Sequence, residues 1–207
     1  MTAIAQRGAI VQRGITLSYV TIAYNTLEAI GSLVAGILAG SVALVGFGAD
    51  SVIEVMASGA AQWRLRADVE AEKRARAEFI SRRVVGWTFL ALAAYILVDS
   101  GNALWNQDPP EKSIFGIIVL ALSVVVMPVL ASAKKKVARE LGSGALKAEA
   151  MQTSLCAYLS VIALAGVGLN ALFGWWWADP VAAIAMVPII AKEGIEGVRA
   201  DTHAECC

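Results

Sequence analysis

Long apolar stretches alternate with short polar breaks along almost the whole chain. A helix needs roughly 20 apolar residues to cross a bilayer whose hydrocarbon core is about 30 Å thick. The pattern therefore predicts an all-α, polytopic membrane protein with six transmembrane helices, over residues 15–40, 42–63, 84–105, 113–133, 145–173 and 180–198. The connections are short, so we expect residues 1–207 to form a single transmembrane domain with no soluble C-terminal domain.

Helix-breaking residues set the boundaries between these spans. Gly40-Ser41 divides the first two, which together would be twice as long as one crossing requires. Pro109-Pro110 and Gly142-Ser143-Gly144 mark two further breaks. Asp179-Pro180 is typical of an N-cap followed by proline in the first helical position. The charged segment between the second and third spans is rich in helix formers, so we expect it to extend both helices into the cytoplasm.

Composition supports a membrane protein and excludes several other classes. Hydrophobic residues make up 58% of the chain and charged residues 16%, against about 25% charged in soluble domains. Lys and Arg (17) balance Asp and Glu (17), which argues against a nucleic-acid partner that needs a basic surface. A single His excludes haem held by paired histidines, and three Cys do not suggest a disulfide framework. We expect no cofactor.

The positions of the cations predict the orientation in the membrane. Of the 17 Lys and Arg residues, 16 fall on the side of the termini and only Lys112 falls on the other. Such cations are retained on the cytoplasmic side, so both termini are predicted to be cytoplasmic, in a bacterial inner membrane. Trp105 and Trp175–Trp177 fall at the outer boundary, and Trp63 and Trp87 at the inner one, as interfacial anchors do.

Acidic residues inside the spans are the first candidates for function, because an ionisable group in a membrane is costly. Asp50 and Glu54 lie four residues apart and therefore share one helix face, where their charges repel. We place Lys134 with the cytoplasmic cations, so no Lys or Arg is expected at mid-depth to neutralise the pair. A cation or proton site is the favoured interpretation. The acidic residues within the spans are Glu28, Asp50, Glu54, Asp99 and Glu149.

The fifth span carries a second pair at the same spacing, Gln152 and Cys156. A thiol beside a divalent metal readily deprotonates and becomes a soft ligand. In membrane helices such residues also serve in packing and interhelical hydrogen bonding. Together the two pairs offer two carboxylates, one amide and one thiolate, a plausible four-coordinate shell for zinc or a neighbouring divalent ion.

These residues resemble those of the cation diffusion facilitator transporters. In that family the second helix follows a G-S-x-A-L stretch with D/H-x-x-x-D, and the fifth carries A-D-x-x-H-x-x-x-D. This chain reads GSVALVGFGADSVIE and then AEAMQTSLC, and WWWADPVAAIAMVPII is similar to the start of the family's sixth helix. The likeness covers all six spans in order, and the FGADSVIE wording resembles small members that lack the usual cytoplasmic C-terminal domain.

The resemblance implies divalent metal efflux coupled to protons, in a homodimer, with Asp50, Glu54, Gln152 and Cys156 as ligands. Gln152 stands where the family has His, so proton exchange would fall to Asp50, Glu54 or Cys156. Cys156 stands where the family has Asp, which softens the site and favours Zn²⁺ or Cd²⁺ over Mn²⁺.

Other polar residues are accessory candidates. Asn25 and Glu28 share a helix face, where they would support the ligands, add a ligand pair or bond between helices. Asp99 belongs to an exit path or, as we favour, to a solvated helix end. Glu149 is a ligand on the cytoplasmic approach or, slightly favoured, a salt-bridge partner near Lys147. Near the C-terminus, His203, Cys206 and Cys207 could form a binding site for a soft metal. The alternative is a frayed chain end without a function.

The sequence thus predicts an alternating-access exporter that takes Zn²⁺ from the cytoplasm in exchange for protons. Exporters of Cd²⁺, Fe²⁺, Co²⁺, Ni²⁺, Mn²⁺ or a small organic cation remain alternatives, as does a membrane metal sensor or scaffold that transports nothing. An intramembrane enzyme with Cys156 as nucleophile is not favoured, since no base is evident beside the thiol.

Overall fold

A computed structural model describes the backbone of residues 2–66, 71–141 and 144–199, and the side chains of 9–59, 83–141, 146–147 and 149–199. The described residues form six helices and no strand, which confirms the all-α prediction. The helices are α1 (Thr2–Ala39), α2 (Val42–Arg66), α3 (Ala71–Asn106), α4 (Ile114–Leu141), α5 (Gly144–Phe173) and α6 (Ala178–Arg199).

Five of these helices, α1 to α5, contain stretches long and apolar enough to cross a membrane. The sixth, α6, is the shortest at 22 residues, and Asp179, Lys192, Glu193 and Glu196 lie within it. Its apolar positions nevertheless form a buried stripe that packs against α3 and α5. The six-helix, multi-pass architecture agrees with the sequence prediction.

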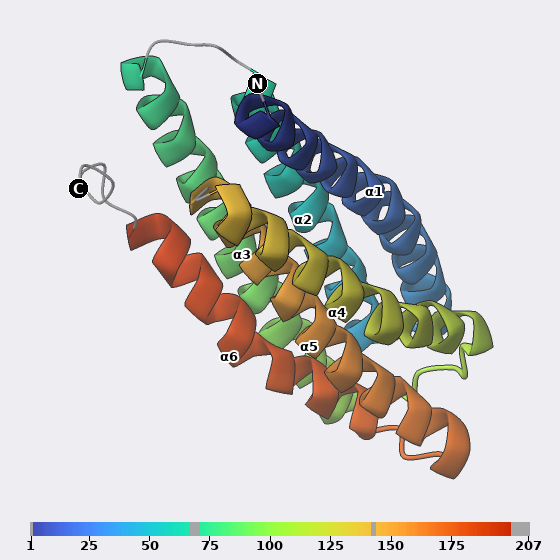
Figure 1. Ribbon diagram of the computed structural model, residues 1–207. Coiled ribbons are helices and arrows are strands. Elements are labelled where there is room, and N and C mark those ends of the chain that lie inside the picture. The colour runs from blue at the N-terminus through green and yellow to red at the C-terminus, as the bar shows by residue number, and fades with distance from the viewer. Residues whose placement is uncertain (1, 67–70, 142–143, 200–207) are drawn as a thin grey trace.

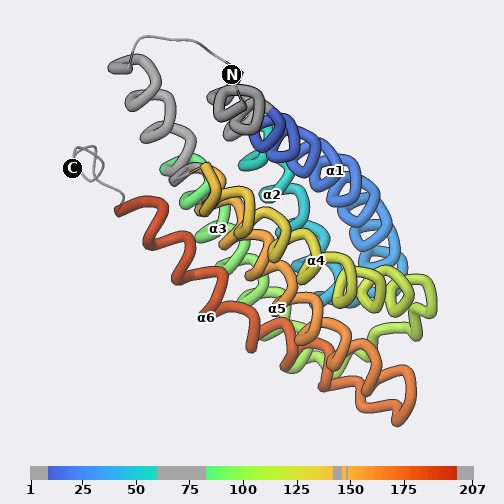
Figure 2. Tube along the Cα trace, in the orientation of Figure 1, coloured from blue at the N-terminus to red at the C-terminus, as the bar shows by residue number. Residues whose placement is uncertain are grey.

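The helices pack as a group of four with an attached pair. In the group, α1 packs against α2 and α4, and α5 packs against α2 and α4. The remaining two, α3 and α6, pack along each other and rest on α2 and α5. Figure 1 shows the start of α1 and the end of α6 toward the same end of the molecule, as six passes require, and the trace in Figure 2 shows α5 between α4 and α6.

The break between α1 and α2 lies where the sequence places it. Gly40 adopts a positive φ of 64°, and the Ser41 amide donates to the Gly36 carbonyl at 2.9 Å, which closes the turn. A Cβ at Gly36 would lie 2.8 Å from the Val45 backbone nitrogen, so the two helices meet there at backbone distance. Close approach of this kind is common between membrane helices that present small residues.

Several helices continue past the predicted spans at the end that carries the termini. The connector between α2 and α3 is helical up to Arg66 and again from Ala71, as expected from its composition. The fourth helix does not end at Ala133 but runs on to Leu141, because the Lys- and Arg-containing segment that follows is itself a good helix former. The extension changes the position of Lys134, as described below.

Asp179 departs from its predicted role. Its carboxylate accepts from the Ser41 hydroxyl and, at 3.4 Å, from the Ala43 amide, so it caps the start of α2 rather than its own helix. The side chain is buried at 1% exposure. Nearby, the Asn170 amide donates to the Pro110 carbonyl at 2.9 Å, and the Glu111 amide donates to the Ala39 carbonyl at 2.7 Å. These contacts tie the connections together at the end opposite the termini.

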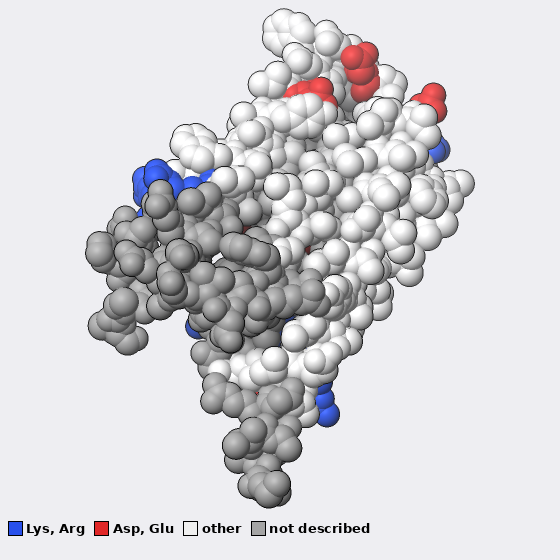
Figure 3. All heavy atoms as spheres, turned by 90° about the horizontal axis from the view of Figure 1, so that it is seen from above, with Lys and Arg blue, Asp and Glu red and all other residues white. Residues whose placement is uncertain are grey.

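The distribution of side chains is that of a membrane protein. Large apolar side chains such as Leu38, Ile114 and Leu172 point outward from the helices, each more than 70% exposed. The described charged side chains lie at the edges of the face in Figure 3, and uncharged atoms form the broad surface between them. Trp105, at 88% exposure, and Trp175 and Trp177, which stack on each other, lie outside the core as the anchor interpretation expects.

Candidate metal site

The acidic pair on α2 is buried inside the group of four helices. Asp50 is 5% exposed and Glu54 1%, and their spacing places both on the face of α2 that packs against α5. From α5, Cys156 is buried beside them, at 1% exposure, and its thiol interacts electrostatically with both carboxyl groups. Gln152 is half-buried, and its Nε2 atom is enclosed. The four predicted ligands therefore come from two adjacent helices.

The first helix adds two more polar side chains to this interior. Asn25 is fully buried and Glu28 is 3% exposed. The Ser51 hydroxyl of α2 donates to Glu28 Oε2 at 2.9 Å, and Cys156 Sγ of α5 lies 3.9 Å from the same oxygen. Glu28 thus connects α1 to both ligand-bearing helices. We call Asn25, Glu28, Asp50, Glu54, Gln152 and Cys156 the acidic cluster.

Several atoms of the acidic cluster have no hydrogen-bond partner among the described residues. They are both amide atoms of Asn25, Glu28 Oε1, Glu54 Oε2 and Gln152 Nε2. A buried polar atom without a partner costs about 1–3 kcal/mol, so native proteins keep few of them without a reason. In the part of the chain that the structure describes, no three His, Cys, Asp or Glu side chains lie close enough to hold a metal as they stand. A bound ion would draw the carboxylates together and give the unpaired oxygens of Asn25, Glu28 and Glu54 a partner.

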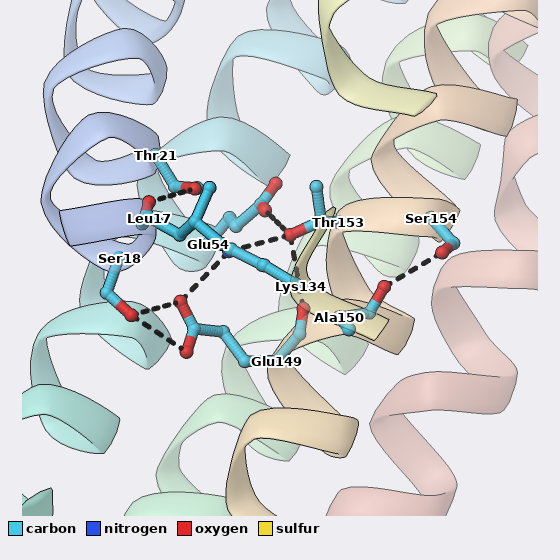
Figure 4. Close-up of polar contacts among 9 residues, drawn as sticks. All are labelled: Leu17, Ser18, Thr21, Glu54, Lys134, Glu149, Ala150, Thr153 and Ser154. Carbon is cyan, nitrogen blue, oxygen red and sulfur yellow. Dashed lines mark hydrogen bonds and ion pairs between the residues drawn. The ribbon is translucent and has the colours of Figure 1, made fainter. Parts of the chain in front are cut away.

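Lys134 contradicts the expectation that no cation lies among the buried acids. Its side chain is fully buried, and Nζ lies 2.9 Å from Glu149 Oε1. Nζ also donates to the Thr153 hydroxyl at 3.0 Å, and that hydroxyl donates to Glu54 Oε1 at 2.6 Å (Figure 4). That expectation was wrong because α4 continues past Ala133, and its buried face carries Lys134 inward to the acids.

A periodic signal in the sequence could have identified Lys134. The buried positions of α4 include Met127, Leu130, Ala131, Lys134 and Ala138, which recur at intervals of three and four. If that stripe is continued beyond the apolar span, Lys134 falls on the buried face of the helix. Lys135 and Lys136 fall on the exposed face, where the structure has them. Thr153 and Ser18 gave no comparable signal, because hydroxyls are common in membrane helices.

Glu149 is a salt-bridge partner, as slightly favoured, but its partner differs from the one expected. It pairs with Lys134, whereas Lys147 is exposed. The Ser18 hydroxyl of α1 donates to both Glu149 oxygens at 3.2 Å. We call Ser18, Lys134, Glu149 and Thr153 the lysine network; Figure 4 shows it joining α1, α4 and α5 to Glu54 of α2.

The other accessory candidates lie apart from the acidic cluster. Asp99 is half-buried near the far end of α3 and accepts from the Tyr95 hydroxyl at 3.1 Å, as a helix-end residue does. The tail residues His203, Cys206 and Cys207 lie outside the described residues. The structure therefore gathers Asn25 and Glu28 with the predicted ligands and leaves Asp99 outside.

Known proteins resemble this chain over much of its length. Magnetosome protein MamB of Paramagnetospirillum magneticum is 28% identical over 176 residues, covering 82% of this chain and 59% of the relative. The manganese efflux system protein MneS of Bacillus subtilis is 24% identical over 188 residues, covering 88% and 64%. The cation-efflux pump FieF of Shewanella oneidensis is 24% identical over 109 residues, covering 52% and 36%.

The chain spans less than two thirds of the length of each of these relatives. A family profile, described as the cation efflux transmembrane domain, matches residues 18–201. That range contains the acidic cluster and the lysine network together with nearly all of the six helices. The chain therefore belongs to the cation efflux family.

Proposed function

We propose that the protein exports a divalent metal cation from the cytoplasm, with Zn²⁺ as its preferred cargo. The observation that supports this most directly is the burial of three carboxyl groups and a thiol, from three helices, around unpaired polar atoms. Such a group of acids in a membrane interior is stable only with protons or a cation. Family membership makes the cation a metal ion.

The proposed ligands are Asp50 and Glu54 from α2 with Gln152 and Cys156 from α5. Glu28 is an accessory ligand or support, since it contacts Cys156 and keeps one oxygen unpaired. Carboxyl and thiol groups bind metal only in their deprotonated forms. Proton exchange would then follow from competition between metal and protons at Asp50, Glu54 and Cys156, without the histidine that commonly titrates near neutral pH.

Alternating access around a fixed site is the proposed transport cycle. The connections at the end opposite the termini are tied together by Asp179 and Asn170, while the lysine network lies toward the other end of α5. We further propose a homodimer in a bacterial inner membrane, with both termini cytoplasmic. Crosslinking in native membranes and labelling of single cysteines from either side test these two points.

The metal itself is the least constrained part of the proposal. MneS is named for manganese and FieF for cations in general, so the relatives do not single out one ion. The buried thiol of Cys156 argues for a soft or borderline ion, since thiolates favour Zn²⁺ over Mn²⁺. Competition of Cd²⁺, Fe²⁺, Co²⁺, Ni²⁺ and Mn²⁺ against Zn²⁺ in one transport assay would rank the cargo.

Uptake of Zn²⁺ into proteoliposomes, with and without an imposed pH gradient, tests the function. We expect uptake that accelerates when the vesicle interior is acidic, because protons then leave as metal enters. The Asp50→Asn variant should bind Zn²⁺ far more weakly and transport it more than about 100-fold more slowly. Transport by that variant at the wild-type rate would overturn the assigned site.

A non-transporting sensor or scaffold is the second candidate. The name of the magnetosome relative states no transport, and a structural ion in the acidic cluster would give the unpaired oxygens of Glu28 and Glu54 a partner. A sensor would bind Zn²⁺ in detergent but show no uptake under any gradient. Uptake together with binding identifies the transporter.

A further inference from the structure

Lys134 is an unusual residue to find inside a membrane protein. A cationic side chain in a span costs at least a few kcal/mol and usually marks a function. This one is fully buried on α4, and its ammonium contacts Glu149 and Thr153, both of α5. Glu149 neutralises it at 2.9 Å, so a structural ion pair would be complete without any further contact.

The lysine has one further contact, and that contact leads to the acidic cluster. Nζ donates to the Thr153 hydroxyl, which in turn donates to Glu54 Oε1 in a 2.6 Å hydrogen bond. The other oxygen of Glu54 remains without a partner. Glu54 is therefore the residue at which the paired and unpaired regions meet. Lys134 and Glu54 are thus joined through one bridging hydroxyl.

We propose that Lys134 is the resident counter-ion of the metal site, which positions Glu54 and lowers the affinity for metal enough to permit release. This inference rests on the proposed function. When the site is empty, the lysine offsets the charge of the acids. When a divalent ion binds, like charges repel across Glu54 and Thr153, and Glu149 holds the ammonium in place.

Substitution at 134 and 149 separates this role from a structural one. Lys134→Met removes the repelling charge, so Zn²⁺ should bind about tenfold more tightly while turnover at saturating Zn²⁺ slows. Glu149→Gln removes the carboxylate that neutralises the Lys134 ammonium. The positive charge then acts on Glu54 without that compensation, so Zn²⁺ should bind more weakly. Each single variant strands one buried charge and should be less stable.

The double variant Lys134→Met/Glu149→Gln makes the test decisive. It removes both charges, so its thermal stability should return toward that of the wild type. If Lys134 acts on the metal, the double variant still binds Zn²⁺ about tenfold more tightly than wild type. If the pair is only structural, the double variant binds Zn²⁺ with the wild-type Kd, and the proposal is overturned.

Two further variants serve as controls. Lys135→Met removes the same charge from the exposed neighbouring position and should leave the Kd and turnover unchanged. Lys134→Arg keeps the charge and should bind Zn²⁺ within about threefold of wild type. Binding is measured in detergent by competition with a fluorescent zinc chelator, and turnover in proteoliposomes. Failure of the wild type to bind or transport Zn²⁺ would refute the proposed function itself, whereas a normal wild type with an unchanged double variant refutes only the role of Lys134.

Discussion

The lysine network and the acidic cluster are both buried, and both include residues of α5. They differ in whether their buried polar atoms have partners. In the lysine network, Lys134, Glu149 and Thr153 satisfy one another within 3.1 Å, with help from Ser18. In the acidic cluster, like charges face one another and several buried atoms have no partner among the described residues. The first arrangement pairs its charges internally, whereas the second keeps unpaired oxygens that a bound cation or proton would engage.

The difference indicates where to look for cargo. Charge alone does not distinguish the two regions, since Glu149 and Glu54 are both acidic, on adjacent helices and almost fully buried. The state of their partners does distinguish them. Glu149 has each oxygen engaged, whereas Glu54 has one oxygen engaged and one free. The pairing of each oxygen therefore separates Glu54 from Glu149, whereas charge and burial do not.

The largest effect is expected from removing the charge of Asp50. Asp50→Asn should lower Zn²⁺ transport by more than about 100-fold, beyond the range of residues that only support ligands. Thermal stability should hold or rise, because one of the repelling acids is gone. Asp99→Asn is the matched control: it removes an acid from the end of α3 that lies apart from the cluster, and its transport should be unchanged. Equal loss in both variants would contradict the site.

A large effect on stability is expected in the lysine network. Glu149→Gln leaves Lys134 as a buried charge without its ion-pair partner, which should lower the free energy of unfolding by about 3–5 kcal/mol. Glu28→Gln, in the acidic cluster, should cost little stability because the Ser51 hydroxyl that donates to Glu28 can also donate to an amide oxygen. Denaturant titration of the two variants in one detergent measures the difference. Equal stability would mean that the two regions are not distinct.

The sequence was enough to predict the helices and the composition of the acidic cluster. The six helices follow from the apolar stretches and the breaks between them, and the spacing of Asp50 with Glu54 and of Gln152 with Cys156 places each pair on one helix face. Contacts between helices could not be predicted in this way. That Glu28 meets Cys156 depends on how α1 packs against the group, and hydropathy does not encode this.

Two errors have the same physical origin. Hydropathy places the end of the fourth span before Lys134, because lysine is charged. The α-helix itself continues to Leu141, since the residues that follow favour helix. Lys134 was therefore predicted to lie beyond the span. Local capping rules assign Asp179 to its own helix, although its carboxylate lies nearer the start of α2. In both cases tertiary packing supplied a partner that neighbouring residues in the sequence could not reveal.

A smaller effect is expected for metal selectivity. Cys156→Asp replaces a soft ligand with a hard one and restores a carboxylate at the position where the resemblance has one. The ratio of Zn²⁺ to Mn²⁺ transport should fall by about tenfold, as thiolate ligands favour the softer ion. Competition uptake with both metals measures the ratio. An unchanged ratio would mean that the thiol does not contact the ion and that Glu28, which lies beside it, holds that side of the site instead.

The smallest effect is expected for an ion pair that is exposed rather than buried. Lys192 and Glu196 lie on α6 with 3.9 Å between Nζ and Oε1, and their side chains are 73% and 63% exposed. Such pairs contribute about 0–1 kcal/mol, because water screens the charges and ordering two long side chains costs entropy. Lys192→Ala should therefore change the free energy of unfolding by less than about 0.5 kcal/mol, measured in the same denaturant titration as Glu149→Gln. A loss as large as that of Glu149→Gln would show that burial is not what separates the lysine network from other ion pairs, because both pairs join one lysine to one glutamate and differ mainly in their access to water.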